Sequence, residues 1–303
     1  MSRVANPSKA LYFKKLVDAL VPGGVCREER DRIAHMVRAY RRSPAVVKVG
    51  GSALSEQCGP MVFDNIKTLG NLGIPLVIVH GGGKEIDDAM KARGLKIERR
   101  GGQRVTDGHT IAVLKDVMPR IGHEIMKSLV DENINATHVW GHGGVLVVER
   151  MSEELGFVGN VVEVLGTHGI LGFARAGIIP VITPLGYSGD QVYNINADNA
   201  AARIAVALGA SGKSARRARK IIFVTNVAGI LDGSNATIRD INVADLKALA
   251  GGSTISGGMI PKVEAAIYAV EGGVGASIID GRKENSLLSH LLGYNGSGTE
   301  IHS

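Results

Sequence analysis

One repeated pattern constrains the fold of this chain more than any other feature. From residue 45 onward, short apolar runs end near glycine and alternate with segments of helical spacing. The runs are rich in β-branched residues and cover 46–49, 75–80, 178–182, 221–225 and 276–279, and the helical segments cover 84–93, 197–210 and 263–270. This alternation is typical of a mainly parallel sheet that helices cover on both faces. Such sheets bind ligands at the carboxyl ends of their strands, where these glycines cluster, so the pattern predicts an α/β fold with a site at that edge.

Residues 1–44 precede this pattern and have a different character. Apolar residues at helical spacing predict a helix over 8–20, and Pro22-Gly23-Gly24 ends it. A second, basic helix is expected over 27–42, closed by Ser43-Pro44. We interpret this segment as an appendage whose apolar stripe covers either the body of the protein or another subunit.

Composition excludes several classes of protein. Hydrophobic residues make up 45% of the 303 residues and charged residues 21%, which is typical of a globular chain and not of a disordered one. Aromatic residues are 4% and the net charge is only +6, so a role in binding nucleic acid is not expected. No uncharged apolar run approaches the roughly 20 residues of a membrane span, and no signal peptide is recognisable. The two cysteines, Cys26 and Cys58, make no disulfide framework, which favours the reducing cytoplasm.

Two glycine-rich strand ends are candidate anion sites. Lys48 precedes Gly50 and Gly51, so a ligand can approach bare backbone beside a positive charge. The alternative is a plain turn with a solvated lysine. His80 precedes the three glycines 81–83, which expose successive N–H groups at the start of a helix. Here the alternative is a tight turn, and we expect His80 to be a packed strand-end residue and not a base.

Two further helix starts carry more polar groups than helix capping requires. Asn194, Asn196 and Asp198 crowd into five positions, although one such residue is enough for a cap, and the excess suggests a ligand. Lys262 follows a Ser-Gly-Gly turn near a helix N-terminus, where the helix dipole disfavours a cation by about 0.3–1 kcal/mol. A bound anion would remove this conflict. Without an anion, we expect the lysine to point into water.

These segments belong to a longer series of motifs that spans about residues 45–301. The series is KVGG (48–51), VHGGG (79–83), GQRVTD (102–107), GFVG (156–159), YNINAD (193–198), NVAGILD (226–232), SGGMIPKVEAA (256–266), IIDGR (278–282) and GSGTEI (296–301). In content and order it resembles the amino-acid kinase family, in particular its acetylglutamate kinase branch. The resemblance implies an open three-layer αβα sandwich around a mainly parallel sheet. It divides the chain into an N-terminal helical extension for oligomerisation (1–44), a substrate-binding lobe (45–185) and a nucleotide-binding lobe (186–303).

The resemblance also implies an activity and a set of site residues. The activity is ATP-dependent phosphorylation of the γ-carboxylate of N-acetyl-L-glutamate in arginine biosynthesis, with ATP and Mg²⁺ as co-substrate and no metal ligand from the protein. Lys48 and Lys262 would flank the transferred phosphoryl group, and Asp198 would hold both lysines. The residues implied in acylglutamate binding are Gly82, Gly83, Arg104, Asn194 and Asn196. Those implied in nucleotide binding are Gly50, Gly51, Thr225, Asn226, Gly229, Leu231, Gly257 and Gly258.

Some positions depart from the family's pattern. Asn226 replaces the usual aspartate before V-A-G, and the sequence GHGG at 141–144 replaces a common G-K-D-G. The connection at 211–220 is longer and more basic than usual, and we expect a surface loop there. The N-terminal helix resembles the extension that interlocks dimers of arginine-sensitive members into a hexameric ring, with Tyr12 near the effector site. A homo-oligomer and an arginine effector are therefore expected from the resemblance.

Two other functions remain open on the sequence. A kinase for a related acidic amino acid, such as acetylaminoadipate, would use the same Arg104 and Asn194, because one methylene leaves no readable signature. The other is a non-catalytic sensor of nucleotide or amino acid. Its weakness is that a binding module does not need Lys48, Asp198 and Lys262 together.

Overall fold

The computed structural model describes residues 7–21, 26–41, 43–50, 59–210, 220–252, 255–293 and 298–303. Several features singled out in the sequence lie outside these residues. They are the helix stop Pro22-Gly23-Gly24, Gly51 of the predicted nucleotide site, Cys58, the basic connection at 211–219, and the first two residues of the motif at 296–301. Lys220, expected at the end of a surface loop, is instead 7% exposed and begins a strand.

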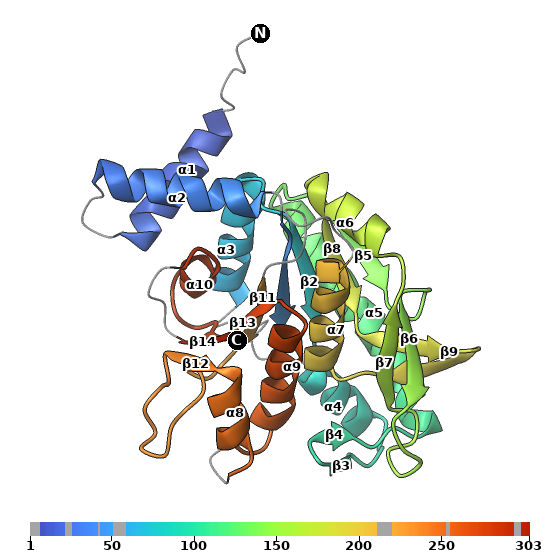
Figure 1. Cartoon of the computed structure of the whole chain (residues 1–303). Coiled ribbons are helices and arrows are strands. Elements are labelled where there is room, and N and C mark those ends of the chain that lie inside the picture. The colour runs from blue at the N-terminus through green and yellow to red at the C-terminus, as the bar shows by residue number, and fades with distance from the viewer. Residues whose placement is uncertain are drawn as a thin grey trace.

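A central sheet of eight strands organises the described part of the chain (Figure 1). In spatial order the strands are β12 (Asp240–Asn242), β14 (Gly298–His302), β13 (Gly275–Asp280), β11 (Lys220–Thr225), β1 (Ala45–Val49), β2 (Leu76–His80), β8 (Ile179–Thr183) and β5 (Ala136–Trp140). The six strands from β13 to β5 are all parallel, whereas β14 runs antiparallel to β13. The mainly parallel sheet predicted from the alternating pattern is confirmed.

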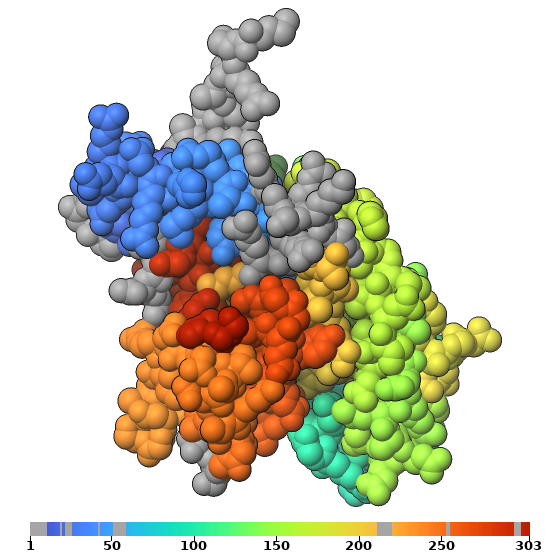
Figure 2. Space-filling model, in the orientation of Figure 1, coloured from blue at the N-terminus to red at the C-terminus, as the bar shows by residue number. Residues whose placement is uncertain are grey.

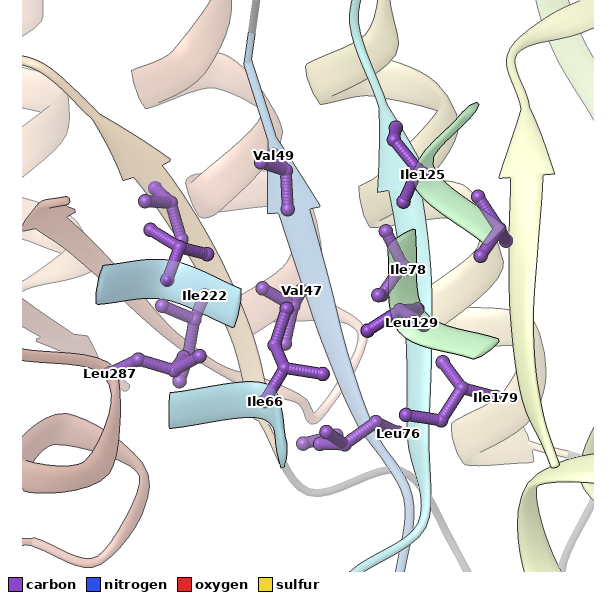
Figure 3. Packing of buried hydrophobic residues seen from close by; sticks show 14 of the residues in the cluster. Val47, Val49, Ile66, Leu76, Ile78, Ile125, Leu129, Ile179, Ile222 and Leu287 are labelled. Atoms are coloured by element: carbon purple, nitrogen blue, oxygen red, sulfur yellow. The ribbon is translucent and has the colours of Figure 1, made fainter. Parts of the chain in front are cut away.

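Helices cover both faces of this sheet and complete the three layers. One layer contains α3 (Gly59–Asn71), α4 (Gly83–Ala92), α5 (Gly108–Asp131) and α10 (Ser286–Leu291), and the other contains α6 (Thr167–Arg175), α7 (Ala197–Ala210), α8 (Val243–Ala250) and α9 (Met259–Glu271). Along the strands, Val47 and Ile78 enter the first core, and Val46 and Val77 enter the second. Figure 3 shows the first core, where Ile66 of α3 packs against Val47. Because both faces are buried, the strands appear in the sequence as unbroken apolar runs.

The two N-terminal helices pack on one end of this body, as the space-filling view shows (Figure 2). These helices are α1 (Pro7–Leu20) and α2 (Arg27–Tyr40), and α1 contacts α3 and α10. Leu16 and Ile33 are fully buried and belong to the first core. The body of the chain therefore covers the inner part of the apolar stripe, whereas Leu11 remains 66% exposed.

The predicted elements agree with the structure to within about two residues at most ends. The main difference is α9, which begins at Met259 and so includes Pro261 and Lys262 in its first turns. The repeated pattern did not predict helices α3, α5, α6, α8 and α10, or strands β5, β12 and β14 of the central sheet. It also did not predict the hairpin of β3 (Arg99–Arg100) and β4 (Gln103–Arg104), or a four-stranded sheet of β10 (Gln191–Asn194), β9 (Leu185–Ser188), β6 (Leu146–Arg150) and β7 (Gly159–Val164). These strands are short or half-exposed and so lack the apolar signal of the central sheet.

The central sheet continues across the boundary that the resemblance suggests at residue 185. Strands β8 and β2 precede it and β11 and β13 follow it, in one hydrogen-bonded series. The division into a substrate lobe and a nucleotide lobe stays a prediction about function. Within the described ranges, every helix is too short or too polar to cross a bilayer.

Candidate active site

Two lysines from distant parts of the chain meet on one buried carboxylate. Lys48 lies in β1, Asp198 in the first turn of α7 and Lys262 in the first turns of α9. Lys48 Nζ is 2.9 Å from Asp198 Oδ1, and Lys262 Nζ is 3.0 Å from the same oxygen and 3.1 Å from Oδ2. The three residues are only 6–8% exposed. The sequence prediction that these three groups converge therefore agrees with the structure.

The charges of this cluster shift the pKa values of its members. Both ammonium groups lie within 3.0 Å of one oxygen, so they are at most about 6 Å apart, a distance at which like charges in a poorly solvated site repel. Burial, together with the charge of Lys48, lowers the pKa of Lys262 to about 8 even though Asp198 opposes the shift. Burial alone would raise the pKa of Asp198, but the two lysine charges outweigh it and hold that pKa below its usual range.

The structure corrects one of the two expectations for Lys262. A lysine without an anion was expected to point into water, but Lys262 is 7% exposed and pairs with Asp198, as the family resemblance implied. The carboxylate supplies negative charge near the N-terminus of α9, where the helix dipole disfavours a lone cation.

The glycine turn after β2 forms a second wall of the site. Gly81 donates its N–H to the carbonyl of Val49 at 2.8 Å, which ties the turn to the end of β1. Gly82 is the N-cap of α4, where the first N–H groups of the helix have no intrahelical partner. A Cβ on Gly82 would lie 2.6 Å from Ile121 Cδ1 and 2.7 Å from Met118 Sδ, so a larger residue there would have to displace these two side-chain ends of α5. His80 is completely buried, as expected for a packed strand-end residue.

Arg104 approaches the same turn from β4. It is 7% exposed, Nη1 donates to Asp87 Oδ1, and Nη2 donates to the carbonyl of Gly83 at 3.1 Å. Arg99 of β3 holds the same Asp87 from the other side, with Nη2 to Oδ2 at 2.9 Å. Burial lowers the pKa of Arg104, although Asp87 opposes the shift. A guanidinium fixed in this way can present its remaining donors to a carboxylate without losing conformational freedom.

The polar residues at 194–198 have two roles, since one caps a helix and others line the site. Asn196 is the cap of α7, since its Oδ1 accepts from the N–H of Asp198 at 2.8 Å and from that of Asn199 at 3.4 Å. Asn194 Nδ2 donates to Thr106 Oγ1 at 3.1 Å. The interpretation that one residue caps the helix while others face a ligand site thus fits, because Asn194, Asn196 and Asp198 all line the cavity described next.

These walls enclose a cavity of about 590 Å³. Of the predicted site residues, twelve line it: Lys48, Gly50, Gly82, Gly83, Arg104, Asn194, Asn196, Asp198, Thr225, Asn226, Gly258 and Lys262. Its charged lining in the described ranges is four cationic side chains, from Lys48, Arg99, Arg104 and Lys262, against the single carboxylate of Asp198. This balance suits a strongly anionic ligand.

Three predicted nucleotide residues stand away from the cavity lining. Gly229, Leu231 and Gly257 are not among the described residues that form it. Gly229 has φ +143°, and a Cβ there would lie 2.7 Å from Thr299 Oγ1. Packing and backbone conformation therefore account for glycine at this position. Leu231 is 39% exposed and pairs in an isolated bridge with Thr237.

Comparison with known proteins agrees with this fold. The family model described as amino acid kinase family matches residues 43–280. The chain belongs to the amino acid kinase family. The acetylglutamate kinase of Acidiphilium cryptum (strain JF-5) is 37% identical over 288 residues, 88% of this chain and 92% of that protein. The acetylglutamate kinase of Bacillus cereus (strain G9842) is 40% identical over 242 residues, 79% of this chain and 90% of that protein.

A solved structure supports the same amino acid kinase fold. N-acetylglutamate synthase from Neisseria gonorrhoeae, complexed with coenzyme A and N-acetyl-glutamate, superposes with a TM-score of 0.79 at 23% identity. The match covers 92% of this chain and 64% of the synthase chain. At this identity the likeness shows the fold alone. Both the fold and the family expected from the motifs are confirmed.

Sequence reasoning missed several lining residues of this amino acid kinase. Arg99, Ile86 and Met118 line the cavity but were not singled out. In the sequence, Ile86 and Met118 look like ordinary apolar residues of helices. Arg99 is one of two adjacent arginines and belongs to no recognisable motif. Only the packing of α4, α5 and the β3–β4 hairpin brings them to the site.

Proposed function

We propose that this chain catalyses the ATP-dependent phosphorylation of the γ-carboxylate of N-acetyl-L-glutamate, a reaction of arginine biosynthesis. The family and the name shared by the relatives support a kinase of this kind. The observation that carries the proposal is the meeting of Lys48 and Lys262 on Asp198, in a cavity that Arg104 and the glycine turn also line. A module that only binds would have no use for two buried ammonium groups held so close together.

The proposed chemistry is a direct transfer. An oxygen of the γ-carboxylate attacks the γ-phosphorus of ATP, and the bond from that phosphorus to the β,γ-bridging oxygen breaks. The products are an acyl phosphate and ADP, which keeps the bridging oxygen and its electron pair. With a reference pKa of ~4.3, the acceptor is already ionised at neutral pH, so the reaction needs no general base.

The obstacle is electrostatic, because an anion must approach a polyanion. A unit positive charge ~4 Å away is worth roughly 4 kcal/mol at an effective dielectric constant of 20. Lys48 and Lys262 supply two such charges, and Asp198, which pairs with both, holds their nitrogens in place before substrate binds. In this proposal Asp198 positions the lysines and does not itself exchange a proton.

The acceptor lies on the side of the glycine turn. Arg104 binds the α-carboxylate of acetylglutamate, and Gly82 and Gly83 donate backbone N–H groups to the reacting end. Asn194 and Asn196 complete the acyl-amino-acid site. The burial of Arg104 and its bond to the carbonyl of Gly83 support this placement.

The nucleotide lies on the side of β11 and the turn before α9. Thr225, Asn226 and Gly258 line the cavity there, and Gly50 lies beside Lys48. Gly51, Gly229, Leu231 and Gly257 complete the proposed nucleotide set.

The metal ion of this reaction would enter as part of the substrate, MgATP. Within the part of the chain that the structure describes, no group of three or more His, Cys, Asp or Glu side chains could hold a metal. Asp198, the carboxylate of the cavity lining, already binds two lysines. The donor set therefore fits an ion held mainly by the ATP phosphates.

A coupled ADP-release assay with four acceptors tests the proposal. We expect turnover with N-acetyl-L-glutamate far above that with glutamate, aspartate or acetylaminoadipate. Preference for acetylaminoadipate would reassign the substrate and keep the chemistry. Binding of nucleotide without ADP release from any acceptor would instead identify a sensor and refute the kinase.

We also propose a homo-oligomer in the cytoplasm, with arginine as a candidate effector at the N-terminal helices. The exposed Leu11 and its neighbour Tyr12 leave part of the stripe of α1 available for a second subunit. Light scattering with and without residues 1–24 tests the assembly. A mass that truncation leaves unchanged would contradict a role of α1 in it. Loss of activity on adding arginine tests the effector.

A further inference from the structure

A chain of four hydrogen bonds runs from the surface to the glycine turn. Trp140 Nε1 lies 3.0 Å from His138 Nδ1, and His138 Nε2 lies 2.7 Å from Thr183 Oγ1. The same hydroxyl lies 2.8 Å from His80 Nε2, and His80 Nδ1 lies 3.0 Å from the carbonyl oxygen of Gly81. Trp140 is 51% exposed, whereas Thr183 and His80 are completely buried. The chain therefore connects a surface side chain with the wall of the cavity.

The direction of every bond in this series follows from its two ends. An indole nitrogen only donates, so His138 Nδ1 accepts and its proton must be on Nε2. A carbonyl only accepts, so His80 Nδ1 carries the proton and its Nε2 accepts. The hydroxyl of Thr183 then accepts from His138 and donates to His80. All five groups are satisfied with both imidazoles neutral and in opposite tautomers.

The fold holds this series tightly. Trp140, Thr183 and His80 are the last residues of β5, β8 and β2, which are adjacent in the sheet. Helix α5 packs over them through Gly122. A Cβ at that position would collide with His138 Nε2 and lie 2.9 Å from His80 Nε2. Only glycine lets the helix come this close.

The last bond, from His80 Nδ1 to the carbonyl of Gly81, fixes the peptide unit between two glycines that line the cavity, Gly81 and Gly82. The carbonyl of Gly81 and the N–H of Gly82 belong to one planar trans peptide, so fixing the direction of the first fixes that of the second. The N–H of Gly81 is already held by Val49 at 2.8 Å. With both sides of Gly81 anchored, the N–H of Gly82 has little freedom to rotate.

We propose that Trp140, His138, Thr183 and His80 form a positioning relay that orients the N–H of Gly82 toward the acceptor carboxylate. The relay rests on the proposed function for the identity of that acceptor. These four are positioning residues, since none of them lines the cavity within the described chain.

The electrostatic surroundings keep the relay neutral. Burial lowers the pKa of His80 to about 4, and the nearby His138 adds to the shift. Burial also lowers the pKa of His138 to about 4, with further contributions from His123 and His142. Both rings therefore remain uncharged at the neutral pH at which the kinase would be assayed.

A matched pair of variants tests the relay in the full-length protein. Thr183→Val keeps the shape of the side chain but removes the hydroxyl, whereas Thr183→Ser keeps the hydroxyl. A neutral hydrogen bond contributes about 1 kcal/mol, so we expect Thr183→Val to raise the KM for N-acetyl-L-glutamate about fivefold. The KM for ATP should stay within about twofold of its original value, and Thr183→Ser should restore both constants. Equal KM values for N-acetyl-L-glutamate in the two variants would overturn the proposal, and so would an equal rise in KM for both substrates. A network with only a structural role would lower the melting temperature without a selective change in the KM for N-acetyl-L-glutamate.

Side-chain ¹H–¹⁵N spectra of the histidines give a second measurement that needs no substrate. We expect His138 with its proton on Nε2 and His80 with its proton on Nδ1. Trp140→Phe changes a half-exposed ring and should leave the proton of His138 on Nε2, because the hydroxyl of Thr183 still accepts from that nitrogen. Only the double variant Trp140→Phe/Thr183→Val, which removes both partners, should release His138 into a mixture of tautomers. The opposite tautomer on either histidine would overturn the relay. Because the spectra do not depend on turnover, an enzyme inactive with acetylglutamate would contradict only the proposed function.

Discussion

Replacing Asp198 by asparagine would remove the carboxylate that two buried ammonium groups share. Asparagine has nearly the same shape, so the change isolates the charge. The structure predicts a large loss of stability, because Lys48 and Lys262 would keep their mutual repulsion and lose their common partner. Turnover should fall as well, since the two nitrogens would no longer be held together.

The geometry sets the size of the effect. At the observed 2.9 and 3.0 Å, each lysine attracts Asp198 by about 5–6 kcal/mol at an effective dielectric constant of 20, while the lysines, at most about 6 Å apart, repel each other by about 3 kcal/mol or more. Desolvation offsets much of the attraction in the native protein. Removing one partner from such a buried charged cluster typically lowers the free energy of unfolding by about 3–5 kcal/mol. We expect Asp198→Asn to destabilise the fold by this amount near neutral pH.

The pH dependence of this loss has a definite sign. The pKa of Lys262, about 8 in the folded protein, is depressed relative to 10.5. Above the pKa that Lys262 has in the folded protein, the unfolded chain binds more protons than the native one. Rising pH therefore stabilises the folded state until it reaches the pKa of the lysine in the unfolded chain. In the folded Asp198→Asn variant, the pKa of Lys262 should be lower still. The rise of its unfolding free energy with pH should therefore begin at a lower pH. The stability gap to the original protein should therefore narrow as the pH is raised above neutral.

Urea denaturation of both proteins between about pH 7 and about pH 9 measures this gap. Asp88→Asn is the matched control, because Asp88 is 58% exposed and lies 4.0 Å from Lys91. The control should change stability by less than about 0.5 kcal/mol. If Asp198→Asn were no more destabilising than the control, or if its gap widened with rising pH, the electrostatic account of the cluster would be wrong.

Three further predictions concern catalysis. Either Lys48→Ala or Lys262→Ala should lower turnover by about 10²–10³, and near-normal turnover would remove that lysine from the mechanism. For Arg104→Lys we expect a much larger rise in the KM for acetylglutamate than for ATP, because lysine cannot bind a carboxylate with two parallel hydrogen bonds, and an equal rise would refute the assignment. Burial and Lys48 lower the pKa of Lys262 to about 8, so kcat/KM for ATP should fall as pH rises past that value. Lys262→Arg should abolish this alkaline limb, and an unchanged limb in the variant would assign it to another group.

The sequence by itself determined the sheet and the general nature of the site. Strands β1, β2, β8, β11 and β13 are buried on both faces, and burial of this kind requires unbroken apolar runs that can be read without a structure. Glycines at the strand ends and the order of the motifs led to the family in the same way.

Only the tertiary structure decided how the polar groups pair. From its local pattern alone Lys262 was expected to meet an anion or water, and only the family resemblance implied its pairing with Asp198, 64 residues away. The tertiary structure also shows that Asn196 caps a helix and that Gly229 is needed for packing. It brings Arg99 to the lining of the cavity. Apolar periodicity reports only whether a residue is buried. The partner of a buried charge depends on which strand ends lie side by side, and the sheet order β11-β1-β2-β8-β5 sets that arrangement.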